Sequence, residues 1–217
     1  MIPGRRWVFS LIAQRGMPPH IIRHSKMVRM VAVAIGQAMR EAGLGIDLVL
    51  VDRAALLHDI CKADTIAHGG DHALLGQRLM ESLGFPDIGA VVGQHIRLAS
   101  FEVNEAMVVN YADKRVMHDR VVSLEKRFLD LMERYSQNGA FSERILAHFA
   151  HVVQIEQAVL KAARLEPGWL ETLNLIPGDH PLYGGGRFLG ERGPAEDQDH
   201  DVDLERVDHD EPAQVDE

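Results

Sequence analysis

The chain has little of several features that would place it in a specialised class. It contains one cysteine, Cys61, in 217 residues, which excludes an internal disulfide framework and fits a reducing compartment. No run approaches the roughly 18 apolar residues that a membrane span needs. The stretch 5–13 begins with two arginines and has a short apolar part, but no small-residue cleavage pattern follows it, so we expect it to form the first helix of the fold. These absences favour a cytoplasmic protein that does not enter a membrane.

A basic surface is missing as well. The net charge of −9 comes from 191–217, which contains twelve acidic residues and two arginines. Residues 1–190 carry 20 acidic and 21 basic side chains. A body so close to neutral, without basic stripes interleaved with aromatics, argues against nucleic acid as the main ligand. Glycine and proline become frequent from 177, and the acidic segment has no aromatic residue. We therefore predict that 177–217 is a flexible, disordered tail.

Long stretches of alternating polar and apolar residues are absent too, which argues against a sheet. Apolar residues instead recur at three- and four-residue spacing up to about residue 176, and this predicts one all-α domain over 1–176. Prolines and glycines mark several helix ends. The expected helices cover 5–13, 18–42, 47–58, 72–83, 86–96, 104–118 with a bent continuation to 135, 142–165 and 169–175, and the expected loop covers 62–71.

The most informative motif is His58-Asp59, which directly follows the apolar run Ala54–Leu57. Three other His-Asp pairs occur: two lie in the acidic tail, and His118-Asp119 lies in a charged helical stretch where both side chains can be solvated. Burying an unpaired imidazole and carboxylate costs several kcal/mol. His58-Asp59 therefore needs compensation, and the dipeptide alone leaves open whether a divalent cation, a hydrogen-bonded partner or solvent at a helix end provides it.

Four further ligand-type residues share this apolar setting, each on a different expected helix. Helical bundles build metal sites from side chains that project inward from facing helices, so their coincidence favours a shared centre. The four are His24, His72, His95 and Asp113. By contrast, His148 and His151 share one face of the last long helix without a carboxylate to complete a site, and we interpret them as packing or surface residues.

In this order, His24, His58-Asp59 and Asp113 resemble the motif of the HD-domain metal-dependent phosphohydrolases. The segment His72–Gly76 resembles the His-x-x-x-Gly signature of members with two metals, in which a further histidine corresponds to His95. The resemblance covers 18–120. It departs from the HDIG subgroup at Cys61, where that subgroup has glycine, and the Gly-Tyr-Pro signature of cyclic-di-GMP phosphodiesterases is absent after His95.

The resemblance implies an HD-type helical bundle that holds one or two divalent metal ions. Imidazole and carboxylate ligands suit manganese, iron, cobalt, nickel or magnesium. His24, His58, Asp59 and Asp113 would hold the first ion, and His72 and His95 a second one, with Asp59 as the bridge.

The implied reaction is attack of a metal-activated water on the phosphorus of a phosphoester or pyrophosphate in a small, nucleotide-like substrate. Asp59 and Lys62 are the candidate catalytic residues. Lys62, one turn after the pair, is the first candidate for phosphate binding; Lys114, Arg115 and Arg97 are secondary ones. Two alternatives stay open: a regulatory or sensor module that binds metal and nucleotide with little turnover, and a metal-free helical interaction protein. The substrate, the number and kind of metal ions and the oligomeric state, including a homo-oligomer, are left open by the sequence.

Overall fold

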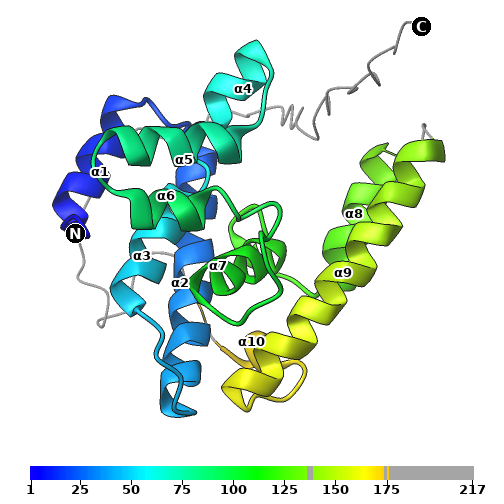
Figure 1. The fold of residues 1–217 in the computed structure, drawn as a ribbon. Helices are drawn as coiled ribbons and strands as arrows, with labels where there is room; N and C mark the ends of the chain where they lie inside the picture. The colour runs from blue at the N-terminus through cyan, green and yellow to red at the C-terminus, as the bar shows by residue number, and fades with distance from the viewer. Residues whose placement is uncertain (136–138, 174, 176–217) are drawn as a thin grey trace, which may run out of the picture.

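The computed structural model describes residues 1–135, 139–173 and 175 (Figure 1). The described part is built almost wholly of helices, and the predicted all-α class is confirmed. The helices are α1 (Arg5–Gln14), α2 (Pro19–Glu41), α3 (Leu48–Leu57), α4 (Lys62–His68), α5 (His72–Ser82), α6 (Pro86–Val92), α7 (Glu105–Lys114), α8 (Leu124–Tyr135), α9 (Gly139–Ala163) and α10 (Trp169–Thr172). The predicted tail, 177–217, lies outside the described residues.

Helix α2 forms the centre of the bundle and packs against α3, α7 and α9 (Figure 1). Its first turn contains Pro19, whose fixed backbone angle suits that position, and the helix ends just before Gly43 in the left-handed conformation, with φ of 99°. Apolar side chains along it are buried at helical spacing, among them Val28, Val31 and Ile35. Their burial supplies much of the core that holds α3 and α7 in place.

Helix α3 delivers the His-Asp pair to the interior. The Asp47 carboxylate caps its first turn by accepting from the backbone N–H groups of Val49 (2.8 Å) and Leu50 (3.1 Å). The apolar run Ala54–Leu57 is at most 1% exposed. The helix ends at Leu57, so that His58 stands at its buried C-terminal end.

Helices α5 and α6 pack closely because of two glycines. A Cβ atom added to Gly76 on α5 would lie 2.7 Å from Cγ1 of Val92, and one added to Gly89 on α6 would lie 2.9 Å from the carbonyl oxygen of Gln77. Real Cβ atoms do not approach so closely. Gly76, the glycine of the His-x-x-x-Gly signature, therefore allows α5 to bring His72 against the end of α6.

Several of the expected element boundaries are wrong. The stretch expected to be a loop contains α4, whose Thr65 is buried (2% exposed) and whose Asp64 pairs with Arg15 from the end of α1. This helix is held by contacts with distant residues and not by its own apolar pattern. Helix α6 also stops at Val92, earlier than expected, and its chain continues through turns.

The expected helix 104–118 ends at Lys114 and gives way to an antiparallel hairpin. Its strands are β1 (Val116–Met117) and β2 (Arg120–Val121), with Val116 opposite Val121. The guanidinium of Arg115 donates to the carbonyl oxygen of Val122 (2.8 Å), which ties the hairpin to the end of α7. His118, at the turn, has a left-handed backbone with φ of 54°.

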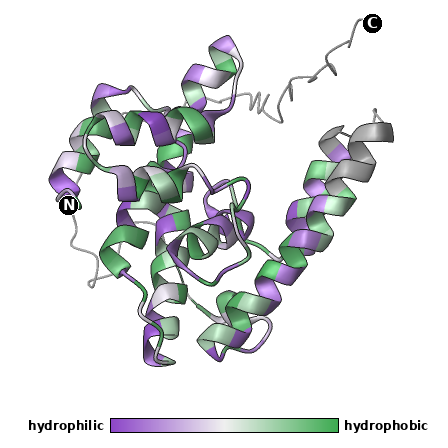
Figure 2. Ribbon diagram, in the orientation of Figure 1, coloured by the Kyte–Doolittle hydropathy of each residue, from purple (hydrophilic) through white to green (hydrophobic). Residues whose placement is uncertain are grey.

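Helices α8 and α9 form a pair along one side of the molecule (Figure 1). Hydrophobic and hydrophilic residues alternate along both (Figure 2), as expected for helices with one buried face. On α9 the buried positions include Val152, Ile155 and Val159. None of the helices in the described part of the chain is both long enough and apolar enough to cross a membrane.

Candidate metal centre

The structure brings together all six residues that the sequence suggests as metal ligands. Each comes from the end or the inward face of a different element, except the adjacent pair at the end of α3. They are His24 on α2, His58 and Asp59 after α3, His72 as the first residue of α5, His95 after α6 and Asp113 on α7. Four of them, His58, Asp59, His72 and His95, are no more than 7% exposed.

The first group consists of His24, His58 and Asp113. Oδ1 of Asp113 lies 3.0 Å from Nε2 of His24 and 3.6 Å from Nε2 of His58. One carboxylate oxygen thus faces two imidazole nitrogens.

The second group consists of Asp59, His72 and His95. Oδ1 of Asp59 lies 3.2 Å from Nε2 of His72 and 3.5 Å from Nε2 of His95, and these two nitrogens are 3.1 Å apart. The other Asp59 oxygen, Oδ2, lies 3.4 Å from Nε2 of His58 in the first group. The Asp59 carboxylate therefore stands between the two groups, with one oxygen toward each.

Backbone carbonyl groups orient three of the imidazoles. Nδ1 of His24 lies 2.9 Å from the carbonyl oxygen of His118. Nδ1 of His58 lies 2.8 Å from the carbonyl oxygen of Ala55, and Nδ1 of His95 lies 2.7 Å from that of Val92. A carbonyl can only accept, so Nδ1 carries the hydrogen and Nε2 of a neutral ring presents its lone pair to the centre. Such outer partners are typical of histidines that bind metal ions.

The spacing of these atoms suits a bound ion. Nitrogen and oxygen ligands at about 2.1 Å from one metal ion lie about 3.0–3.4 Å from each other in octahedral or tetrahedral arrangements. The observed separations, from 3.0 to 3.6 Å, lie within this range or up to 0.2 Å above it. In addition, Nε2 of His58 is fully buried and has no hydrogen-bond partner among the described residues. A divalent cation would satisfy that nitrogen, so the residues present fit a metal site.

The local charges favour a cation as well. Burial alone would raise the pKa of Asp59, but Lys62 and His58 outweigh it and hold this pKa well below its usual range. Lys114 and the neighbouring imidazoles do the same for the pKa of Asp113. Burial lowers the pKa of His58, yet Asp59 and Asp113 raise it to about 10. Two ionised carboxylates thus attract a positive charge to the interior, which a proton on His58 supplies when no metal ion does.

A lysine stands beside each carboxylate. Nζ of Lys62 lies 3.2 Å from Oδ2 of Asp59, and its side chain is 24% exposed. Nζ of Lys114 lies 2.7 Å from Oδ2 of Asp113 and donates to the carbonyl oxygen of His95 at 3.1 Å. Lys62 is therefore the lysine with access to an incoming anion, while Lys114 ties the loop after α6 to α7.

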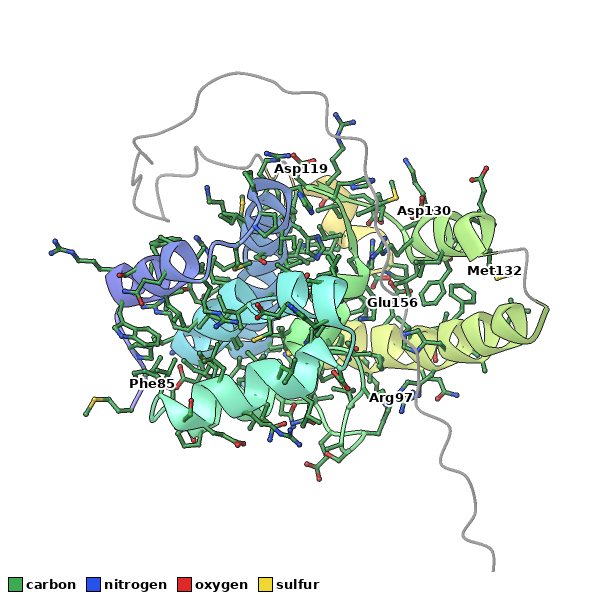
Figure 3. All side chains as sticks on the ribbon, turned by 90° about the horizontal axis from the view of Figure 1, so that it is seen from above. Phe85, Arg97, Asp119, Asp130, Met132 and Glu156 are labelled. Atoms are coloured by element: carbon green, nitrogen blue, oxygen red, sulfur yellow. The ribbon has the colours of Figure 1, made fainter. Side chains whose placement is uncertain are left out.

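The structure does not bring Arg115 to the centre. Its guanidinium contacts the Tyr111 hydroxyl (2.6 Å), Glu156 on α9 (2.9 Å, labelled in Figure 3) and Glu171, and these contacts hold α7 against α9 and α10. The structure does not support Arg115 as a phosphate ligand, because Glu156 and Glu171 already neutralise its guanidinium. Arg97, also labelled in Figure 3, is exposed in the loop after α6.

Sequence reasoning missed two groups that hold the ligands. The buried Asn110 donates to the carbonyl oxygens of Gln94 and His95, both at 2.9 Å, and so fixes the loop that carries His95. An amide inside the apolar stretch 107–112 was the signal for it. The carbonyl of His118 positions His24, and no local pattern could have indicated this, because the contact spans 94 residues.

The comparisons with known proteins agree with the helical architecture. The family model described as HD domain matches residues 21–138. The chain is 27% identical to a tRNA (cytidine(56)-2'-O)-methyltransferase of Thermoplasma volcanium over 64% of this chain and 43% of that protein. It is 37% identical to Ribonuclease Y of Aquifex aeolicus over 41% of this chain and 15% of that protein. The chain thus spans less than half the length of either relative.

Two further similarities are more distant in sequence. An uncharacterised protein of Methanocaldococcus jannaschii is 23% identical over 58% of this chain and 84% of its own length. The crystal structure of a predicted HD superfamily hydrolase from an uncultured Thermotogales bacterium aligns with a TM-score of 0.44 and 21% identity, over 74% of this chain and 93% of that chain. Because the HD domain family model matches more than half of the 217 residues, the chain belongs to the HD domain family.

Proposed function

We propose that this protein is a metal-dependent phosphohydrolase that cleaves a phosphoester or pyrophosphate bond in a small, nucleotide-like substrate. The observation that carries the proposal is the position of Asp59, whose two carboxylate oxygens face two separate groups of imidazoles. Membership of the HD domain family supports it. His24, His58, Asp59 and Asp113 would hold one ion, and His72, His95 and Asp59 a second.

The donor set indicates which ions would bind. Nitrogen and carboxylate oxygen ligands without thiolate suit manganese, iron, cobalt, nickel or magnesium. An ion held here would lower the pKa of a bound water and offset negative charge at phosphorus.

The residues around the centre have distinct tasks in this proposal. Lys62, whose side chain is 24% exposed, offers N–H donors to the phosphoryl oxygens beside the Asp59 carboxylate. Carbonyl groups of the chain keep the imidazoles oriented, so little rearrangement is needed when an anion arrives. The buried apolar residues beneath His58, among them Leu56 and Leu57, exclude water from the inner side of the centre.

The decisive experiment combines metal content with a substrate screen. The full chain, purified without a chelator or a histidine tag, is analysed for metal and then assayed with added manganese or iron for phosphate release. The panel contains nucleoside mono-, di- and triphosphates, dinucleoside polyphosphates, cyclic dinucleotides and sugar phosphates. We expect at least one equivalent of metal and turnover of one of these classes, both lost in Asp59→Asn.

Each other outcome has a definite meaning. Stoichiometric metal without turnover of any class would overturn the enzymatic proposal in favour of a regulatory module that binds metal. Substoichiometric metal, with no gain on adding manganese or iron, would end the proposal of a metal centre altogether.

A further inference from the structure

The first group of candidate ligands is carried by the central helices of the bundle. His24 lies within α2 and Asp113 within α7, and His58 directly follows the last residue of α3. These three helices pack against one another. The backbone at the ligands of the first group is therefore fixed by the core of the bundle itself.

The two histidines of the second group stand at helix ends. His72 is the first residue of α5 and follows Gly69 and Gly70, which both have a left-handed backbone, with φ of 75° and 107°. His95 comes after the end of α6, in a segment of turns and bends. Glycines and irregular segments restrict the backbone less than a packed helix does, so other contacts must hold this group in position.

The contacts that hold His95 come from α7. The side-chain NH2 group of Asn110 donates to the carbonyl oxygens of Gln94 and His95, both at 2.9 Å. Nζ of Lys114 donates to the same oxygen of His95 at 3.1 Å. Asn110 and Lys114 are one helical turn apart on α7. The backbone of His95 thus receives two donors from the helix that also carries Asp113, a ligand of the first group.

The amide of Asn110 is satisfied on one side only. Asn110 is 1% exposed and interrupts the apolar stretch 107–112. Its Oδ1 atom is buried and has no hydrogen-bond partner among the residues that the structure describes. The amide cannot be turned around, because Oδ1 would then face two carbonyl oxygens, which only accept. A buried acceptor without a partner is unfavourable, so what this residue contributes is its pair of donated bonds to the turn of His95.

We propose that Asn110 is a positioning residue for the second ion. By holding the turn of His95 against α7, it sets the affinity of the site formed by Asp59, His72 and His95. The first ion depends on it little, because no ligand of the first group lies in that turn. Binding is therefore stepwise, with a tightly held first ion and a weaker second one. This inference rests on the metal centre of the proposed function, but not on the reaction.

The test titrates manganese into the full chain after its metal has been removed with a chelator. Calorimetry measures the affinity of each equivalent, and electron paramagnetic resonance shows whether two ions lie close enough for their spins to couple. In the wild type we expect two equivalents, of which the second binds more weakly and produces the coupled signal. Asn110→Leu has a similar volume but no donors. Its second equivalent should bind about 10- to 100-fold more weakly, as for other outer partners of metal ligands, while the affinity of the first equivalent stays at the wild-type value.

Further variants separate positioning from a general loss of stability. Tyr111→Phe, at the next position of α7, removes a buried hydroxyl that donates to Glu156 on α9 (2.6 Å). This control should lower stability and leave both manganese affinities unchanged. Asn110→Gln, which offers the NH2 group on a longer side chain, should recover part of the second affinity. If Asn110→Leu does not fold, Asn110→Ser takes its place, and the same selective loss is expected.

Several outcomes would overturn the role of Asn110. They are a second equivalent that binds as tightly to the variant as to the wild type, an equal loss for both equivalents, the same loss in Tyr111→Phe, and a wild type that binds a single equivalent. A protein that gives one of these results and still releases phosphate loses only this inference. A protein that shows the selective loss but hydrolyses no phosphoester keeps it and loses the enzymatic proposal.

Discussion

Two buried carboxylates lie seven residues apart at the two ends of the same stretch of chain, and their surroundings differ. Asp52, within α3, is 3% exposed and contacts Arg5 (2.6 Å), Arg29 (3.3 Å) and Arg53. Asp59, just after α3, is 2% exposed and contacts Lys62 and the imidazoles of the candidate centre. The first carboxylate is surrounded by permanent cations, and the second chiefly by rings that can be neutral.

This difference indicates separate roles for the two residues. A guanidinium stays charged and has no lone pair to offer, so the surroundings of Asp52 can stabilise a carboxylate but cannot bind a metal ion. A neutral imidazole offers a lone pair, so the surroundings of Asp59 are incomplete until a cation is added. Asp52 should therefore contribute to stability and Asp59 to metal binding.

Replacing Asp59 by asparagine should have the largest effect on function. The amide keeps the shape of the side chain but removes the charge between the two groups of imidazoles. We expect loss of bound metal and a fall in turnover of at least about 100-fold, since even outer partners of metal ligands cost up to that factor. Metal analysis and phosphate release measure both, and circular dichroism should show wild-type helicity. Full metal occupancy in Asp59→Asn would show that the centre is wrongly placed.

Replacing Asp52 by asparagine should instead lower stability and leave metal binding and turnover unchanged. It leaves the buried Arg29 and the half-buried Arg5 and Arg53 without their carboxylate, and breaking a buried ion pair on one side costs roughly 3–5 kcal/mol. The free energy of unfolding, measured with denaturant, should fall by about that amount, while the folded fraction keeps its metal and its turnover. If the folded variant loses metal, the two carboxylates do not act independently.

The two lysines of the centre refine the comparison further. Lys62→Met removes the accessible cation beside Asp59, and we expect KM for the substrate to rise by about tenfold, as for the loss of one charge-assisted hydrogen bond. Metal content should stay at the wild-type level, and Lys62→Arg should restore part of the affinity. In Lys114→Met, by contrast, the His95 loop loses a donor, so metal content should fall. Equal effects of the two variants on metal and KM would contradict these separate roles.

The helical arrangement near these carboxylates was predictable because it depends on local patterns. The Asp47 cap, the apolar run Ala54–Leu57 and the glycine after α2 are signals within a few residues of the boundaries that they define. The six ligand-type residues could be selected for the same reason, since each precedes, follows or interrupts an apolar helical run. The sequence could therefore predict that the helices point these six side chains toward the interior.

The features that were missed depend on contacts between distant parts of the chain. Helix α4 is held by the pair of Arg15 and Asp64, and the hairpin by the contact of Arg115 with Val122. His148 was interpreted as a packing or surface residue because no carboxylate completes a site there, and its ring does pack against that of Phe128, with 5.7 Å between the centroids. Because α9 packs against α7, the charges of Lys114 and Asp113 act on His148, and no periodicity within α9 contains that information.

His148 gives the last prediction, which concerns only how the stability of the fold depends on pH. Burial and the Lys114 charge lower the pKa of His148 to about 4, whereas an unfolded chain has a value near 6.5. Between these values the unfolded chain binds a proton that the folded protein does not, so stability falls as the pH is lowered from 6.5 to 4. In His148→Gln this contribution is absent, and the loss of unfolding free energy across that window should be smaller by up to about 3 kcal/mol. Denaturant titrations at several pH values measure the slope, with Leu83→Ala as a control that removes no titrating group. An identical slope in His148→Gln and wild type would show that folding does not lower the pKa of His148.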